Sequence, residues 1–418
     1  MLSRRQLVAS TAASWLCAGI PYSRADNAVD HKAAAKAPRY FVTMFLRGGL
    51  DAIYTTDPKT KSQVEAKVDV PYDGNAIIDA GGLQFGPHFK TLAPWAKHMA
   101  VVRGIQVKTA NHETGAFQMM RMRTRVSTSM PTFAEVVGQA RDGQPLASVT
   151  LGELSSFEHS PGALAMPTVN NASAIDALDD LEDKDIAVLA DVYQRHLKSI
   201  GTWDQSAQTR QTREYVAQAA AFFERLKTTP RYGGGPSKNN KAGRASNDFD
   251  RTLWFLENDL ARSVTIKVFF DWDSHFRNAE KQTGANGAFT ALLDEFLRGL
   301  HSKKNKHGTL AEQTVVIVGS EMGRFPVLNG NLGKDHWPET TFMIMGPGIN
   351  TDGGRGAAYG ITGPFMEGKK INKVTGKPDD AGQHLRLDDV GVTLMSMAGL
   401  KPSTYGYQGD RLRFLESA

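Results

Sequence analysis

Residues 314–318, Thr-Val-Val-Ile-Val, form an uninterrupted run of β-branched side chains that stops at Gly319-Ser-Glu321. Such a run indicates a strand buried on both faces, as in parallel sheets that are covered by helices. Ligands of these sheets bind beyond the carboxyl ends of the strands. Glu321 is therefore a candidate site residue, although a Glu in this place can also be the N-terminal charge of a following helix.

The same change from apolar to polar residues occurs at three other segments. Residues 39–46 lead to Asp51, residues 99–107 lead to Thr109-Ala-Asn-His112, and residues 264–270 lead to Asp271-Trp-Asp-Ser-His275. Helical patterns near 250–262, 288–301 and 389–398 alternate with these strands and with a strand over 340–345. This order predicts an α/β fold, a three-layer α/β/α sandwich with a mostly parallel central sheet.

The length of 418 residues permits one large α/β domain with insertions or two domains. We expect a single domain over residues 39–418, preceded by a linker over 26–38. Apolar spacings of three and four residues predict a helical covering layer inserted at about 174–228. The Gly-, Ser-, Asn- and Lys-rich residues 230–247 predict a flexible loop.

Residues 1–25 have the composition of an export signal. The pair Arg4-Arg5 precedes an apolar, Ala-rich run through Ile20, and Ser23-Arg-Ala25 is suited to cleavage. This combination is typical of a Tat-type signal peptide, which implies the Tat translocase as a partner and a periplasmic or secreted location. An uncleaved anchor is the alternative, but the run is short and diluted by polar residues, so we expect no stable membrane span in the mature form.

Charge and cysteine content exclude several classes of function. The formal net charge is +5, but removing three leader arginines leaves 46 basic against 44 acidic residues, a net charge of +2. We therefore expect no nucleic-acid partner. The single cysteine, Cys17, lies in the leader, so the mature chain has no disulfide, no thiolate nucleophile and no cysteine metal site.

Carboxylates and imidazoles gather after the predicted strands. Hard oxygen and imidazole donors bind divalent cations, and an Arg can pair with an anion through two hydrogen bonds. A glycine turn closed by Asp51, an exposed acidic turn at 271–275 and a helix cap at Thr109 or Asn111 are the structural alternatives. The candidate metal ligands are Asp51, Asp271, Asp273, His275, Glu321 and His336.

Five segments together resemble the bacterial DUF1501 proteins, a family of undefined function, over nearly the whole mature chain. They are Phe45-Leu-Arg-Gly-Gly-Leu-Asp51, Asn111-His-Glu-Thr-Gly115, Trp272-Asp-Ser-His275, Ser320-Glu-Met-Gly-Arg324 and Asp335-His-Trp337. Residues 388–400 with 409–412 are similar to the closing helix and strand of sulfatases, which links the chain to the alkaline phosphatase-like superfamily.

The wider resemblance implies an alkaline phosphatase-like di-metal hydrolase fold. Asp51 matches the early Asp of that family, Asp271 or Asp273 with His275 matches its Asp and His set, and His336 matches its late His. Glu321 matches the Asp of the Ser-Asp-His-Gly motif, but Met322 replaces the metal-binding His of that motif, and a thioether is a poor ligand for Zn, Mn, Mg or Ca.

The helix start also departs from the relatives. Asn111-His-Glu-Thr-Gly115 resembles the Asn-Ser-Glu-Val-Gly of cofactor-independent phosphoglycerate mutases, with His112 at the nucleophile position. The resemblance leaves one metal site incomplete or absent and the nucleophile open between His112 and Thr109. Arg324 or Arg47 would neutralise the developing anion.

Three functions follow as expectations. The first is a periplasmic hydrolase that uses a divalent metal ion, Zn, Mn, Mg or Ca, on an anionic small-molecule or polymer ester of phosphate or sulfate. The second is a catalytically inactive ligand-binding protein on the same fold. The third is an assembly or export partner that uses the helical layer as its surface.

Overall fold

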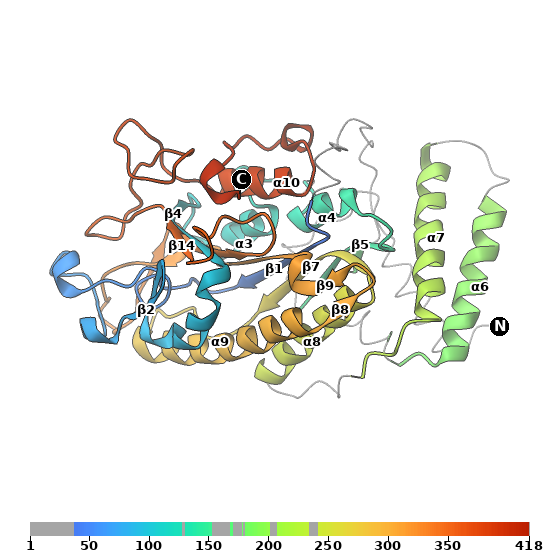
Figure 1. Ribbon diagram of the computed structural model, residues 1–418, viewed down its shortest axis with the longest axis horizontal. Coiled ribbons are helices and arrows are strands. Elements are labelled where there is room, and N and C mark those ends of the chain that lie inside the picture. Colours follow the sequence, from blue (N-terminus) through green and yellow to red (C-terminus); the bar gives the residue numbers. More distant parts are fainter. Residues whose placement is uncertain are drawn as a thin grey trace.

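An eight-stranded sheet forms the centre of the protein, in the order β14-β4-β13-β10-β1-β7-β5-β6 (Figure 1). The computed structural model describes residues 37–127, 130–152, 168–169, 178, 180–200, 207–233 and 241–417. The strands of the sheet are β1 Tyr40–Leu46, β4 Met99–Gln106, β5 Leu146–Leu151, β6 Thr168–Val169, β7 Ala261–Val268, β10 Thr314–Gly319, β13 Glu339–Met345 and β14 Ala357–Tyr359.

Five of the seven strand pairings are parallel, which confirms the predicted mostly parallel sheet. Strand β13 runs antiparallel to both of its neighbours, β10 and β4. Two successive reversals give β4 the same direction as β10, β1 and β7. The carboxyl ends of these four strands therefore lie at one edge of the sheet, and the segments that follow them meet there.

Helices cover both faces of the sheet, as predicted for a three-layer sandwich (Figure 1). One face carries α3 His112–Arg121, α4 Phe133–Val137 and α10 Leu387–Met397, and the other carries α8 Lys241–Glu257 and α9 Asn278–Ser302. In β1, Val42 and Met44 pack into the core on the α8 and α9 side, whereas Phe41 and Phe45 pack into the core on the α3 and α10 side. Alternate side chains of a strand point to opposite faces, so a strand covered on both sides is apolar throughout.

Two helices, α6 Asp183–Ile200 and α7 Ala207–Leu226, lie side by side at one end of the sheet (Figure 1). Tyr193 and Phe223 stack between them with ring centroids 5.4 Å apart. These helices fall within the predicted helical layer. Residues 241–247 of the loop expected over 230–247 are helical instead, because α8 begins at Lys241. The burial of Ala245 and Phe249 anchors the first turns of α8.

Short elements complete the chain. No helix in the described part is long and apolar enough to cross a membrane, and residues 1–25, the expected leader, lie outside that part. The small strands are β2 Ile78–Ala80, β3 Leu83–Phe85, β8 Lys304–Asn305, β9 Gly308–Thr309, β11 Gly323–Arg324 and β12 His336–Trp337. The 3-10 segments are Lys61–Gln63, Gly74–Ala76, Pro87–His98, Gly138–Ala140, Leu310–Glu312, Pro402–Tyr405 and Arg413–Leu415.

Candidate metal centre

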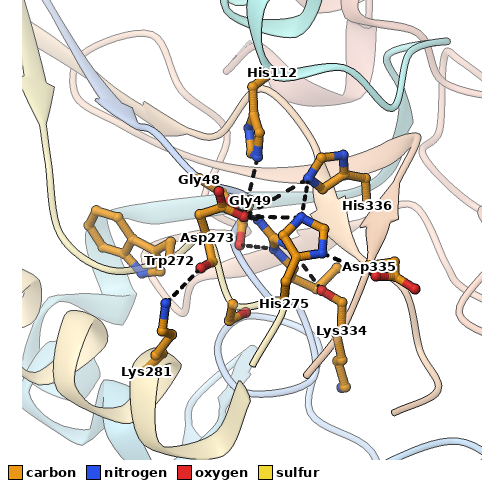
Figure 2. A network of polar contacts seen from close by, with 12 residues as sticks. Gly48, Gly49, His112, Trp272, Asp273, His275, Lys281, Lys334, Asp335 and His336 are labelled. Carbon is orange, nitrogen blue, oxygen red and sulfur yellow. Dashed lines mark hydrogen bonds and ion pairs between the residues drawn. The ribbon is translucent and has the colours of Figure 1, made fainter. Parts of the chain in front are cut away.

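Four side chains converge at the carboxyl edge of the sheet (Figure 2). They are those of His112, Asp273, His275 and His336, and one donor atom of each lies within 4.8 Å of the others. His112 opens α3 after β4, Asp273 and His275 follow β7, and His336 lies on β12. Residues far apart in sequence are thus gathered by the common direction of the strands.

His112 is positioned by the start of α3 and by a buried carboxylate. Asn111 is the N-cap, and its Oδ1 accepts a hydrogen bond from the backbone N–H of Thr114 at 2.9 Å. The Nδ1 of His112 lies 2.7 Å from Oε1 of Glu321. Its Nε2 is buried without a hydrogen-bond partner and faces Oδ1 of Asp273 at 3.4 Å.

The other two histidines are held in the same way. The Nδ1 of His336 lies 2.5 Å from the carbonyl oxygen of Ala110, and the Nδ1 of His275 lies 3.1 Å from Oδ1 of Asp335. Their Nε2 atoms are 2.9 Å apart. Hydrogen bonds from His275 and Asn329 hold the pKa of Asp335 below its usual range, so this carboxyl group is ionised and can only accept.

These contacts fix the tautomers of the three rings. Carboxylate and carbonyl oxygens accept hydrogen bonds, so each Nδ1 must carry a proton and donate it. In the neutral ring, Nε2 then has a lone pair directed at the cluster. The hydrogen bond between the Nε2 atoms of His275 and His336 needs a proton on one of them, which a bound cation would replace. A hydrogen bond at the other ring nitrogen is the usual way in which proteins orient metal-binding histidines.

Asp273 contributes the negative charge of the cluster. Burial raises its pKa, but hydrogen bonds and charges from His112 and Arg324 outweigh burial and hold the pKa below its ordinary value. Arg324 donates from Nη2 to Oδ1 of Asp273 at 2.8 Å. Half of the Asp273 side chain, 51%, remains exposed, so the cluster is open to solvent on this side.

Arg324 itself is buried, and its guanidinium points into the protein. Besides Asp273, its guanidinium donates to the carbonyl oxygen of Lys334 at 3.0 Å and to the carbonyl oxygen of Gly48. The expected anion clamp is therefore a group that orients Asp273, because its hydrogens are already used within the protein.

Glu321 lies behind the cluster. Its buried carboxylate accepts from the backbone N–H of Gly48 at 2.9 Å and from Oγ of Ser320 at 2.8 Å, besides His112. Gly48 has φ +125, and a Cβ there would lie 2.6 Å from the backbone nitrogen of Asp273. Glu321, expected as a ligand, instead orients His112.

Three other expected site residues lie outside the cluster. Asp51 pairs with the buried ammonium of Lys334, 2.8 Å from its Oδ2, so a lysine rather than a metal ion balances its charge. Asp271 is exposed, and its nearest cation is Lys281 at 3.7 Å. Thr109 accepts a hydrogen bond from the backbone N–H of Asn111 at 3.2 Å, which stabilises the turn before α3.

The protonation of the cluster depends on its charges. Burial lowers the pKa of His112, but the adjacent carboxylates of Asp273 and Glu321 outweigh this effect and raise the pKa to about 9. Burial lowers the pKa of His336, and the neighbouring charges of His112, Arg324 and His275 lower it further. Without a cation, a proton on His112 therefore balances part of the negative charge.

The donor set fits one divalent cation. Three imidazole nitrogens and one carboxylate oxygen are ligands that Zn²⁺ and similar ions accept. The buried Nε2 of His112 has no hydrogen-bond partner, which is costly for a polar atom unless something binds it. A second cation beside Asp51 does not fit, because the Lys334 ammonium occupies that place.

A family model and several solved structures match the chain. The family model "Protein of unknown function (DUF1501)" matches residues 39–375. No curated protein matches the sequence.

Three of the matching solved structures are as follows. A protein of the alkaline phosphatase superfamily from Vibrio parahaemolyticus has 10% identity and a TM-score of 0.42, with 96% of this chain and 76% of that chain covered. A 2-O GAG sulfatase has 10% identity and a TM-score of 0.41, with coverages of 91% and 75%. Alkaline phosphatase from the Antarctic bacterium TAB5 has 10% identity and a TM-score of 0.35, with coverages of 78% and 94%.

Proposed function

The chain belongs to the DUF1501 family of proteins of unknown function, and we propose that it is an exported hydrolase that uses one divalent cation to cleave phosphate or sulfate esters. The observation that carries the proposal is the convergence of three histidine Nε2 atoms and the Asp273 carboxylate within 4.8 Å. Each ring is held at Nδ1 by an acceptor, so the Nε2 atoms are oriented for an ion.

The residues have separate tasks in this reaction. A cation at the centre would supply Lewis-acid polarisation of an ester oxygen and a lowered pKa for water. Water adds to phosphorus or sulfur, the bond to the ester oxygen breaks, and the alcohol leaves with a proton that comes from the water. Glu321 keeps His112 in place, and Arg324 keeps Asp273 ionised and oriented.

Access to the centre is sufficient for a substrate. The side chains of Asp273 and His275 are 51% and 37% exposed. Lys281 donates to the carbonyl oxygen of Asp273 at 3.1 Å (Figure 2). An ammonium group has three donors, so Lys281 is the cation that we assign to the anionic group of the ester in place of Arg324.

Zinc fits these donors best among the four candidate ions. Imidazole suits Zn²⁺, whereas Mg²⁺, Mn²⁺ and Ca²⁺ favour oxygen ligands. Three imidazoles and only one carboxylate therefore select against Mg²⁺, Mn²⁺ and Ca²⁺.

A second function is supported by one observation. The buried guanidinium of Arg324 is used within the protein, so one of the two arginines expected to stabilise the developing anion is not available to the reaction. A protein that binds an anionic ligand through its metal ion without turnover would have the same geometry. Turnover of an ester separates the two functions.

Metal analysis and an ester panel test the proposal. The purified mature protein should hold about one equivalent of metal and hydrolyse phosphate or sulfate monoesters, and His275→Ala should lose both. His307→Ala is the matched control, because its side chain is 36% exposed against 37% for His275 and it lies beside Asp259 instead. A metal-loaded wild-type protein without turnover of any ester would leave ligand binding as the function.

We propose export by the twin-arginine route on the basis of Arg4-Arg5, the apolar run and the small residues before position 26. The mature protein would then act in the periplasm or outside the cell.

A further inference from the structure

The two chain segments that carry His275 and precede His336 also carry exposed apolar side chains. Among the residues that the structure describes, six large hydrophobic side chains are exposed, and three of them are Phe276 at 57%, Leu328 at 37% and Leu332 at 66%. Phe276 follows the ligand His275 directly, and the other two precede His336 in the loop 326–333. Single exposed hydrophobics are ordinary, but a group beside a charged site needs a reason.

Backbone hydrogen bonds tie the two segments together. The N–H of Arg277 donates to the carbonyl oxygen of Asn331 at 3.2 Å, and the N–H of Asn278 donates to that of Leu332 at 2.8 Å. The side chain of Asn329 donates to the carbonyl oxygen of His275 at 3.1 Å. The loop that carries Leu328 and Leu332 is therefore fastened to the segment that carries Phe276 and His275.

The loop holds Leu332 in an unfavourable conformation. Its φ is +53, in the left-handed region that leucine rarely adopts. Gly333 follows, and a Cβ there would lie 1.9 Å from the carbonyl oxygen of His275, so the loop approaches the metal-binding segment as closely as backbone allows. Backbone strain and exposure both oppose leucine at position 332, and such strain is concentrated at functional sites.

We propose that Phe276, Leu328 and Leu332 form an apolar subsite for the hydrocarbon part of an amphiphilic ester whose anionic group lies at the metal centre. This inference rests on the proposed function and adds the substrate class. The two segments that carry the apolar residues also lead into the ligands His275 and His336, so a ligand with a charged end and an apolar end is complementary to both.

The size of the patch argues for a small ligand instead of a second copy of the chain. A stable protein interface buries roughly 800 Å² on each partner. Three partly exposed side chains fall well short of that area, since even a fully exposed aromatic side chain offers only about 150–250 Å². They are sufficient to contact one alkyl chain or one aromatic ring.

Alkylphosphonates test the subsite without depending on turnover, because their C–P bond resists ester hydrolysis. Calorimetry on the zinc-loaded full-length mature protein would compare ethyl-, butyl- and octylphosphonate below their critical micelle concentrations. We expect affinity to rise with chain length, by up to about fourfold for each methylene that becomes buried. The double variant Phe276→Ser with Leu332→Ser should lose most of the octyl-to-ethyl affinity ratio.

Val374→Ser is the matched control for this experiment. Val374 is 65% exposed, close to the 66% of Leu332, but it lies in the turn 372–377. Its substitution should leave the affinity ratio unchanged. Circular dichroism and metal content of each variant would show that a lost ratio is not a lost fold.

Each outcome decides one of the two claims. Equal affinities for all chain lengths, with esters still hydrolysed, would overturn the subsite and leave the proposed function standing. Chain-length dependence without hydrolysis of any alkyl phosphate or sulfate would support the subsite and refute the hydrolase. Dissociation of a dimer by the double variant, or binding of the wild type to phosphatidylglycerol vesicles that the variant loses, would assign the patch to another partner and overturn the inference.

Discussion

Glu321→Gln tests whether the carboxylate of Glu321 orients His112 for metal binding. Glutamine has the same shape as Glu321, and its carbonyl oxygen can still accept from the N–H of Gly48 and from Nδ1 of His112. Its amide can donate to Oγ of Ser320, which donates to the carbonyl oxygen of Leu46 at 2.6 Å. The fold should therefore be retained, while the charge behind His112 is removed.

The expected loss is in metal affinity. Removing a partner that orients a metal-binding histidine typically costs 10–100-fold in affinity, or about 1.4–2.7 kcal/mol. The 2.7 Å contact between His112 and a buried carboxylate places Glu321 in this range. The pKa of His112 should also fall, because the adjacent carboxylates of Asp273 and Glu321 raise it to about 9 against the lowering effect of burial.

Competition with a chromophoric chelator would measure the zinc affinity of wild type and variant. Glu113→Gln is the control, since Glu113 is the next residue on α3 and is exposed. This control also removes one carboxylate charge near His112, from the first turn of α3, but Glu113 does not contact Nδ1 of His112. An unchanged affinity in Glu321→Gln, with folding intact, would refute the idea that Glu321 orients a ligand.

Lys334→Met should lower the free energy of unfolding by about 3–5 kcal/mol in urea denaturation, because it leaves the carboxylates of Asp51 and Asp69 without their buried ammonium. Its metal content should stay near that of the wild type, because Lys334 balances Asp51 and not the metal cluster, and a loss of metal with the fold retained would contradict this separation. In the chelator-treated protein, the raised pKa of His112 contributes stability that is present below about pH 6.5 and lost as pH rises to about 9, so thermal melts should show a decrease across this window. Zinc affinity should rise across the same window, since the ion must displace that proton, and a flat profile would contradict the assignment. Lysine replacement of the twin-arginine pair in the leader should leave the precursor in the cytoplasm, and mature protein in the periplasmic fraction would contradict Tat export.

The strands that position the site were predictable because their patterns are strong. The unbroken apolar runs of β1 and β10 predict strands buried on both faces, and the polar residues after β7 and β10 fall at the expected edge. Asp273, His275 and His336 could be named from this argument. The direction of β13 could not, because an apolar run of this length has the same pattern in parallel and antiparallel pairings.

The contacts that assign roles to the residues depend on tertiary structure. Lys334 neutralises Asp51 across 283 positions of sequence, and nothing near either residue indicates the pair. Arg324 faces inward because two backbone carbonyls and Asp273 accept its hydrogens. Asp335 was visible beside His336 in the sequence, but its contact with His275 depends on how the loop after Pro326 folds back.

Strand β5 and the edge strand β14 were not predicted from the sequence, for a different reason. Residues 146–151 and 357–359 are short, and neither has a long apolar run or a clear alternation to mark it. Pairing with β7 and β4 makes them strands, so the neighbouring strand decides their structure.

Anomalous X-ray diffraction at the zinc edge, from crystals of the mature protein grown with zinc, would test the metal centre most directly. Our account predicts one strong anomalous peak per chain, bound by Nε2 of His112, His275 and His336 and by the carboxylate of Asp273. An empty cluster, or a peak beside Asp51 in place of the Lys334 ammonium, would contradict it.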